Sequence, residues 1–255
     1  MSELVRIERP HGGAVIGITL ARPERRNAIT VAMYAAMAEA VEAANADAAV
    51  RLITITGEGR DFTAGNDLGD FLQAMPAPGT SDIPVWRLLR ALATNQKPLI
   101  AAVQGNAVGI GTTLLLHCDF VLVEEGCRMV MPFVDLGLVP EAASSLLLPR
   151  MAGRRAAART LLLGEAFGAE EALGMGIASH VVAAGQLGPA LGALVGALLA
   201  KPAQALQLTQ SLLRRADSDA VLDRMELENA HFAERLTSDE VKRAIAAFFA
   251  QRAKA

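Results

Sequence analysis

The residues whose types and spacing best suit catalysis lie in a glycine-rich stretch near the middle of the chain. Gly105, Gly109 and Gly111 follow an apolar run over residues 99–103 that is typical of a buried strand, and they precede an apolar segment over residues 112–117 that favours a helix. The first backbone N–H groups of a helix have no partner inside it, so they can stabilise a developing negative charge. The stretch predicts either an oxyanion site built from backbone amides, suited to an enolate or a tetrahedral intermediate, or a turn that serves only tight packing.

Two phosphate-binding motifs are excluded for this stretch. A Walker loop requires Lys and then Ser or Thr after its last glycine, whereas Gly111 is followed by Thr112 and Thr113. The dinucleotide-binding motif requires a third glycine at the position that Leu114 occupies. A site for a developing negative charge is the remaining chemical interpretation.

A second glycine loop and three carboxylates are further candidates. Residues 62–68 join apolar residues to a glycine just before an expected helix start. Glu141 follows Pro140 in what we expect to be the first turn of a helix, where the helix dipole would lower the pKa of an ordinary glutamate. We expect Asp67 to be structural with at most a supporting role in substrate binding, and Asp135 to face the substrate or to cap a loop or helix.

The elements that must position these residues alternate between strand and helix in the first half of the chain, which is typical of an α/β fold. We expect strands at 5–9, 14–20, 52–56, 99–103, 120–123 and 179–182, helices at 31–45 (N-capped by Thr30) and 85–92, a loop at 75–82, and mainly helix from 154 onward. Pro202 separates a buried helix over 187–200 from a tail of three helices, the last N-capped by Ser238. This pattern predicts a core domain over residues 1–200 and a helical C-terminal part over residues 201–255.

Composition excludes several classes of function. The chain of 255 residues carries a net charge of −3 and no basic stripe, which argues against a nucleic-acid partner. Cys118 and Cys127 lack metal-ligand spacing, so we expect no metal site and a reduced, cytoplasmic chain. His117 is interpreted as a hydrogen-bonded core histidine. The N-terminus shows no secretory pattern and the apolar run over 187–200 falls short of the roughly 20 residues of a membrane span, so no membrane partner is expected.

Three motifs together resemble the crotonase superfamily, also called the enoyl-CoA hydratase/isomerase family, over nearly the whole chain. They are FTAGNDL at residues 62–68, GNAVGIG at residues 105–111 and PFVDLGLVPEAASS at residues 132–145. The resemblance is closest to the delta-3,delta-2-enoyl-CoA isomerases of the peroxisomal type and their bacterial relatives. It implies a crotonase-type spiral of repeated β-β-α units with a helical C-terminal trimerisation part, and assembly as a homotrimer or a dimer of trimers.

Members of this family stabilise the enolate of an acyl-CoA thioester with two backbone N–H groups. By position, the resemblance assigns these donors to Asn66 and Ile110. It also implies substrate binding by residues of both loops and of the segment before Glu141, namely Ala64, Gly65, Asp67, Leu68, Gly109, Phe133, Leu136 and Leu138. Coenzyme A is expected as part of the substrate, without a separate cofactor.

Departures from the family pattern bear on the reaction. The two glutamates of typical hydratases correspond here to Thr113 and Phe133, and neither side chain can act as a carboxylate base. The isomerase subgroup instead has one glutamate, which corresponds to Glu141. A single carboxylate can move a proton from C2 to C4 of a 3-enoyl-CoA, and an apolar pocket walled by Phe133, Leu136 and Leu138 would raise its pKa toward neutrality. The resemblance therefore implies an enzyme that shifts a double bond from the 3 to the 2 position of an enoyl-CoA.

Two other functions stay open at this point. One is a different reaction of the same superfamily, either hydration with an unusual residue set or thioester hydrolysis, which would require a group that holds water. The other is a non-catalytic acyl-CoA-binding protein that keeps the glycine loops. Arg25 and Arg26 could hold a phosphate in either case, although exposed loop arginines usually contact only solvent.

Overall fold

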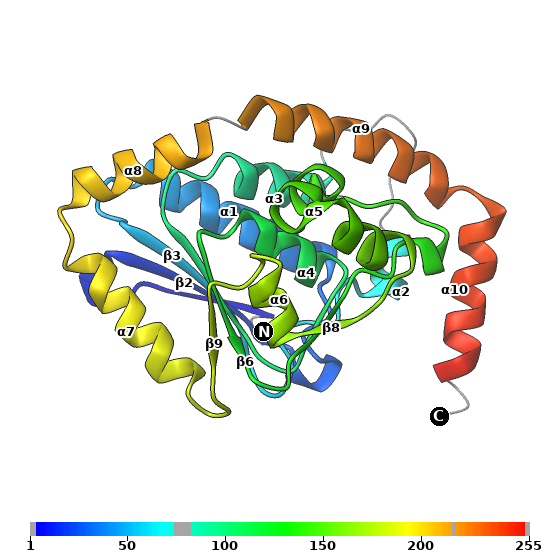
Figure 1. The fold of residues 1–255 in the computed structure, drawn as a ribbon, viewed down its shortest axis with the longest axis horizontal. Coiled ribbons are helices and arrows are strands. Elements are labelled where there is room, and N and C mark those ends of the chain that lie inside the picture. Colours follow the sequence, from blue (N-terminus) through cyan, green and yellow to red (C-terminus); the bar gives the residue numbers. More distant parts are fainter. Residues whose placement is uncertain (1–3, 74–82, 216–217, 253–255) are drawn as a thin grey trace.

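A computed structural model describes residues 4–73, 83–215 and 218–252, and it contains one large and one small β-sheet (Figure 1). The large sheet has six strands in the order β1-β2-β3-β4-β6-β9. Their bounds are Val5–Glu8 (β1), Val15–Leu20 (β2), Leu52–Gly57 (β3), Leu99–Val103 (β4), Phe120–Glu124 (β6) and His180–Val182 (β9). β1 and β2 pair antiparallel and all other neighbours pair parallel, so the connections between parallel strands cross over the sheet.

The small sheet begins with the strand that directly follows β4 in the chain. It contains β5 (Asn106–Val108), β7 (Arg128–Val130) and β8 (Phe167–Gly168) in that spatial order. Gly105 makes the turn between the two sheets with a φ of 59°, and a Cβ atom at this position would lie 2.2 Å from the carbonyl oxygen of Arg60. Glycine is therefore required where the chain passes from one sheet to the other.

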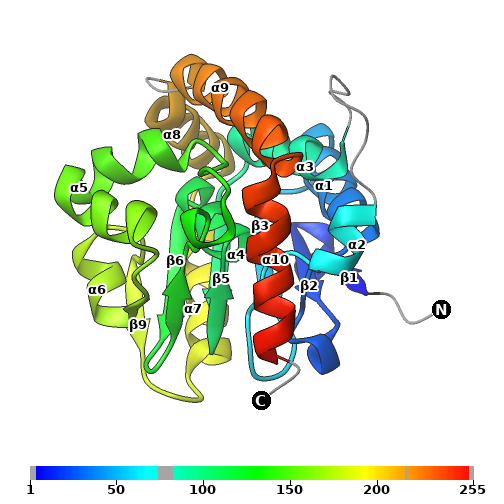
Figure 2. The same cartoon turned by 90° about the vertical axis from the view of Figure 1, so that its right-hand side faces the viewer.

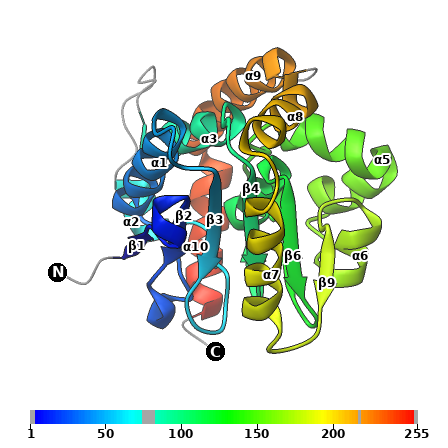
Figure 3. The ribbon, with the colours of Figure 1, turned by 90° about the vertical axis from the view of Figure 1, so that its left-hand side faces the viewer.

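The large sheet separates two apolar layers. On β4, Leu99, Ala101 and Val103 belong to the main core, which includes α1 (Val31–Ala46) and α3 (Pro84–Ala93). Ile100 points to the opposite face, where α7 (Leu187–Leu199) covers the sheet (Figure 3). This alternation is the period of two that a strand buried on both faces requires.

The remaining helices flank the candidate loops or form the C-terminal part. They are α2 (Leu68–Gln73), α4 (Ile110–Thr113), α5 (Ser144–Leu162, interrupted at Gly153), α6 (Ala169–Gly174), α8 (Ala203–Arg215), α9 (Ser218–Leu236) and α10 (Asp239–Arg252), with 3-10 turns at His11–Gly13 (η1), Pro23–Arg25 (η2), Leu114–His117 (η3) and Val134–Leu136 (η4). Figure 1 shows α8 and α9 along the top of the molecule and α10 descending beside it, and Figure 2 shows α10 face on. Arg235 Nε donates to the carbonyl of Gly137 at 3.0 Å, which ties the C-terminal part to the segment before Glu141.

Most predicted elements are confirmed, including the strands, the three helices of the tail and both N-caps. The Thr30 hydroxyl accepts from the N–H of Met33, and the Ser238 hydroxyl accepts from the N–H of Val241, each at 3.3 Å. The predicted loop over 75–82 lies outside the described residues.

Two expectations about the second half are wrong. α5 begins at Ser144, after the helix start expected at Pro140 and Glu141, and Glu141 lies in a turn rather than in a helix. The physical reason is that Ala142 and Ala143 adopt left-handed conformations with φ of 59° and 54°, which prevent a helix from starting at Pro140. The three short strands of the small sheet, β5, β7 and β8, were not predicted. The apolar run over 187–200 predicted a buried helix, but α7 buries only one face, which packs on the sheet. Its outer face consists largely of glycine and alanine.

Within the described ranges, no single helix is both long and apolar enough to cross a membrane. α7 and α8 reach that length and composition only together, and the two are bent by 107° at their junction.

Candidate active site

The two glycine loops are hydrogen-bonded side by side. Thr63 N–H donates to the carbonyl of Asn106 at 3.0 Å, and Val108 N–H donates to the carbonyl of Thr63 at 3.1 Å. A Cβ atom on Gly65 would lie 2.7 Å from the Val108 carbonyl oxygen, and one on Gly111 would lie 2.3 Å from the Thr63 Cγ2 atom. Both glycines are therefore needed for the close approach of the loops to each other.

A buried asparagine organises the first loop from behind. Asn27 has a left-handed φ of 54° and is fully buried. Its Nδ2 group donates to the carbonyls of Glu58 at 2.9 Å and Asp61 at 2.7 Å, and its own carbonyl accepts from the Thr63 hydroxyl at 2.7 Å. Asn27 was not among the site residues predicted from the sequence. Its short amide side chain, which tolerates the left-handed conformation, was the available signal.

A buried aspartate fixes the second loop to the first. Asp61 Oδ1 accepts from the N–H of Asn106 at 3.1 Å and from the Asn106 side chain. Burial opposes ionisation of Asp61, but the Asn106 hydrogen bonds and the Arg60 guanidinium hold its pKa below the ordinary value. A charged side chain with satisfied oxygens thus locks the loops in one relative position.

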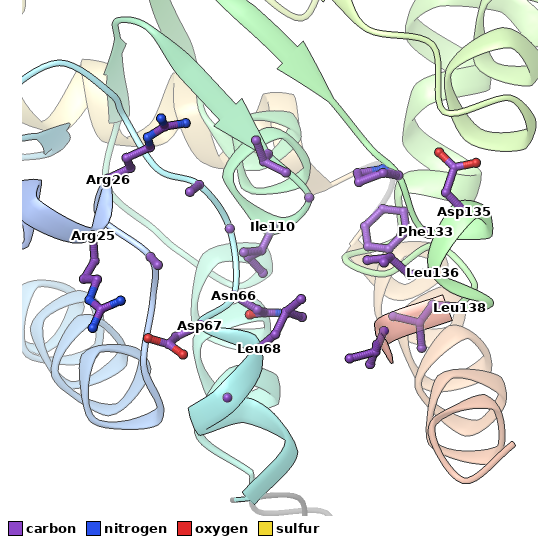
Figure 4. Close-up of a pocket in the computed structure, with 18 of the residues that line it drawn as sticks. Arg25, Arg26, Asn66, Asp67, Leu68, Ile110, Phe133, Asp135, Leu136 and Leu138 are labelled. Atoms are coloured by element: carbon purple, nitrogen blue, oxygen red, sulfur yellow. The ribbon is translucent and has the colours of Figure 1, made fainter. Parts of the chain in front are cut away.

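The two predicted oxyanion donors lie next to each other across this loop pair. Ile29 pairs with the first loop through Gly65 O and Asp67 N, at 2.8 and 2.9 Å, on either side of Asn66. Ile110 is the first residue of α4. Among the described residues, neither the Asn66 N–H nor the Ile110 N–H has a backbone or side-chain acceptor. Both residues line one pocket (Figure 4), so two unpaired donors are available to a ligand.

The pocket has a volume of about 560 Å³, and its lining combines apolar residues with charged ones, among them Arg25, Arg26 and Asp135. Every predicted substrate-binding residue contributes to its lining: Ala64, Gly65, Asp67, Leu68, Gly109, Phe133, Leu136 and Leu138. Phe232 and Leu236 of α9 and Ile245 of α10 complete the apolar wall, which the sequence analysis did not foresee. Figure 4 shows Phe133, Leu136 and Leu138 across the cavity from Asn66 and Leu68.

Glu141 is buried but is not part of the pocket lining. Its side chain is buried, with 2% of the residue exposed, and its Oε1 atom accepts a hydrogen bond from the Thr113 hydroxyl at 3.0 Å. Burial raises the pKa of Glu141 to about 8, against the Thr113 hydrogen bond and with the help of the negative charge of Glu228. The pKa of Glu141 is raised as expected, but by burial outside the pocket that Phe133, Leu136 and Leu138 line. The lowering expected for a glutamate in a first helical turn is wrong, because no helix begins at this residue.

The single tyrosine of the chain connects the two parts of the site. Tyr34 on α1 is fully buried, and its hydroxyl donates to the Asn66 Oδ1 atom. Burial and the nearby Glu141 raise the pKa of Tyr34 well above its ordinary value, so it remains a donor at neutral pH. Sequence patterns place Tyr34 on a helix that packs in the core but give no sign of its polar partner 32 residues away.

The other candidate side chains have structural or peripheral positions. Asp67 Oδ2 pairs with Arg22 Nη1 at 2.7 Å, and although burial opposes it, this contact holds the pKa of Asp67 below its usual value. Asp135 on η4 is exposed and belongs to the pocket lining. Arg25 and Arg26 also line the pocket. His117 is buried as expected, with Nε2 donating to the Ala142 carbonyl at 2.8 Å, and burial lowers its pKa to about 4.

Metal binding has no candidate in the described part of the chain. No group of three or more His, Cys, Asp or Glu side chains there is arranged to hold an ion.

Comparison with known proteins identifies what the chain is similar to. The family model described as enoyl-CoA hydratase/isomerase matches residues 11–255. The 1,2-epoxyphenylacetyl-CoA isomerase of Escherichia coli is 35% identical, with 93% of each chain covered, and a putative enoyl-CoA hydratase of Thermus thermophilus is 32% identical, with 98% of each covered. The crystal structure of an enoyl-CoA hydratase/isomerase from Pseudoalteromonas atlantica superimposes with a TM-score of 0.92 at 36% identity, covering 98% of both chains.

Proposed function

The chain belongs to the enoyl-CoA hydratase/isomerase family and has its crotonase fold, and from this premise we propose that it moves the double bond of an enoyl-CoA from the 3 to the 2 position. The observation that carries the proposal is the combination of one buried carboxyl with two replaced hydratase positions. One buried carboxyl, that of Glu141, has a pKa of about 8, while Thr113 and Phe133 stand where a hydratase of this family would have its two glutamates. A single base of this kind suits a proton shift better than the activation of water.

The proposed reaction uses Glu141 first as a base and then as an acid. The carboxylate removes a proton from C2, and the electrons of the C2–H bond form a dienolate that extends to the thioester oxygen. The N–H groups of Asn66 and Ile110 stabilise that oxygen, each contributing on the order of 3 kcal/mol to the transition state. The protonated Glu141 then delivers the proton to C4, and the double bond comes to lie between C2 and C3. No atom is gained or lost.

The remaining pocket residues are assigned to the rest of the substrate. We assign the thioester and pantetheine to the backbone around Ala64 and Leu68, and a coenzyme A phosphate to Arg25 and Arg26. Phe133, Leu136 and Leu138 contact the acyl chain. Because Glu141 is not a lining residue, the proposal requires the bound acyl chain to approach the carboxyl past this apolar wall. Coenzyme A enters only as part of the substrate.

The direct test is an absorbance assay with a 3-enoyl-CoA that follows formation of the conjugated 2-enoyl thioester, with 2-enoyl-CoA hydration measured in parallel. We expect conjugation by the native protein, and a loss of at least 10³-fold in kcat in Glu141→Gln with acyl-CoA binding retained. Glu125→Gln, which changes an exposed glutamate, is the matched control. Full activity in Glu141→Gln, or hydration without conjugation, would overturn the mechanism. Binding without either reaction would favour a different thioester reaction or a binding protein.

The proposal extends to assembly and cellular location. We propose a homotrimer or a dimer of trimers in the cytoplasm, as the family resemblance implies. Large apolar side chains on two helices are exposed in the single chain, including Leu162 and Leu163 at the end of α5 and Leu212 and Leu213 on α8. Exposed apolar groups of this kind are typical of surfaces that subunit contacts cover. Light scattering coupled to size-exclusion chromatography measures the mass directly, and a monomer would refute the assembly.

A further inference from the structure

A carboxylate from the C-terminal part lies inside the turn that carries Glu141. Glu228 on α9 is buried, with 5% of the residue exposed. Its Oε2 atom accepts from the N–H of Ala143 at 2.6 Å, and its Oε1 atom accepts from the N–H of Ser145 at 3.0 Å. Both N–H groups belong to the beginning of α5, where backbone donors have no partner inside the helix. Glu228 thus caps α5 from a position more than 80 residues further along the chain.

The turn that Glu228 holds is conformationally unusual. Ala142 and Ala143 both have left-handed φ values, and neither is a glycine or an asparagine. Two consecutive alanines adopt this conformation only when the surroundings determine it. On the other side of the turn, His117 Nε2 donates to the Ala142 carbonyl at 2.8 Å, and the Ser144 N–H and hydroxyl donate to the Glu141 carbonyl at 2.9 and 2.6 Å. The backbone directly after Glu141 is therefore fixed from both sides.

We infer that Glu228 is a positioning residue, which holds the left-handed turn at 142–143 and thereby directs the Glu141 carboxyl toward Thr113 and the oxyanion loops. The inference rests on the proposed function, because it assigns a role relative to the base of that reaction. The two acceptor oxygens explain why a carboxylate is needed here. A glutamine would offer one acceptor oxygen and place its NH₂ group against the other N–H donor.

The charged and titratable groups around Glu141 come from several elements. Tyr34 faces it from α1 and Glu228 from α9, and His117 of η3 contacts the turn through the Ala142 carbonyl. Arg224, also on α9, donates to the Ser145 hydroxyl at 3.1 Å and lies beside Glu228. Because the negative charge of Glu228 opposes ionisation of Glu141, its removal lowers the pKa of Glu141, whereas loss of a purely structural contact would not change that pKa.

The experiment compares Glu228→Gln and Glu228→Asp with the native protein and with Glu226→Gln, which changes an exposed glutamate on the same helix. We expect Glu228→Gln to reduce kcat at least tenfold with KM within threefold, and to move the pH midpoint of kcat to lower pH. Glu228→Asp keeps the charge, but its side chain is shorter by one methylene, so its oxygens lie farther from the two N–H donors. We therefore expect kcat to fall while the pH midpoint of kcat stays near the native value. Native kcat and an unchanged midpoint in Glu228→Gln would overturn the inference. A loss of kcat no larger than the loss of folded protein in the same sample would also overturn it.

A second measurement separates this inference from the proposed function. The Glu141 carboxyl can be titrated by infrared difference spectroscopy against Glu141→Gln, and exchange of the Ala143 and Ser145 amides can be followed by NMR, both without substrate. A native protein without isomerase activity refutes the proposed function alone. An unmoved Glu141 midpoint together with native amide exchange in Glu228→Gln refutes the positioning role alone.

Discussion

The Thr113 hydroxyl donates a 3.0 Å hydrogen bond to the Glu141 carboxyl, and both groups are buried. The family resemblance aligns Thr113 with a glutamate of typical hydratases. Here this position supplies a donor that favours the ionised form of the remaining carboxyl, while burial disfavours it. The balance between these two effects sets the pH at which Glu141 can accept a proton.

The pH dependence of catalysis should report this balance. Because a base must be ionised in the free enzyme, we expect kcat/KM for isomerisation to rise about tenfold per pH unit below pH 8 and to level off above it. Steady-state rates between pH 5.5 and 9.5 measure the profile. A profile that is flat from pH 6 to 9 would contradict the assignment of Glu141 as the base.

Replacing Thr113 by valine should shift the midpoint of this pH profile to higher pH. The substitution keeps the shape of the side chain but removes the donor that lowers the pKa of Glu141, so the midpoint shifts to higher pH. At pH 7 we expect kcat/KM to fall about 3–10-fold, as a pKa increase of about 0.5–1 unit implies. Thr94→Val, at an exposed position on the C-terminal end of α3, is the control. A downward shift of the midpoint would show that Thr113 does not stabilise the carboxylate.

Stability should also depend on the protonation of Glu141. Its folded-state pKa of about 8 lies above the ordinary 4.5, so the folded chain keeps a proton that the unfolded chain has lost between these values. Stability from this group is therefore complete below pH 4.5 and is lost as pH rises toward 8, by up to about 1.4 kcal/mol per pH unit. Urea unfolding of the native protein and Glu141→Gln should show a difference that grows in favour of the glutamine variant from pH 5 to 8. A difference independent of pH would be inconsistent with a buried, protonated Glu141.

The packing of the two glycine loops can be tested with a pair of alanine substitutions. Gly65 and Gly126 have nearly the same φ, +84° and +82°, but a Cβ atom meets the Val108 carbonyl at the first position and nothing within 4 Å at the second. We expect Gly126→Ala to cost about 1 kcal/mol of unfolding free energy. Gly65→Ala should cost about 3 kcal/mol or more and reduce kcat strongly, because the clash displaces the Asn66 amide. Thermal unfolding and rate measurements on both variants test this prediction. Equal effects of the two substitutions on stability and kcat would mean that the loops tolerate separation.

The parts of the site that follow from local sequence were predictable, and the parts that depend on distant contacts were not. The glycine loops, their flanking strands and the apolar segment before Glu141 have short-range signals, and they were placed correctly. The polar support of the site has none: Asn27 bonds to residues more than 30 positions away, Tyr34 bonds to Asn66, and Glu228 bonds to a turn 85 positions earlier.

The error at the start of α5 has the same origin. Proline followed by glutamate favours a first helical turn, and two alanines are good helix formers. The left-handed turn at Ala142 and Ala143 coincides with hydrogen bonds made by Glu228 and His117, which the local pattern does not contain. Local propensity therefore does not decide the conformation of the residue next to the candidate base.

The apolar wall formed by Phe232, Leu236 and Ile245 has a consequence for synthesis of the protein. A ribosome completes both oxyanion loops by residue 111, but it supplies this wall and Glu228 only more than 100 residues later. A nascent or prematurely terminated chain thus carries the amide donors without a closed acyl pocket and without the support of Glu141. If the proposed function is correct, we expect isomerase activity to depend on completion of α9 and α10, which supply three residues of the pocket lining and Glu228.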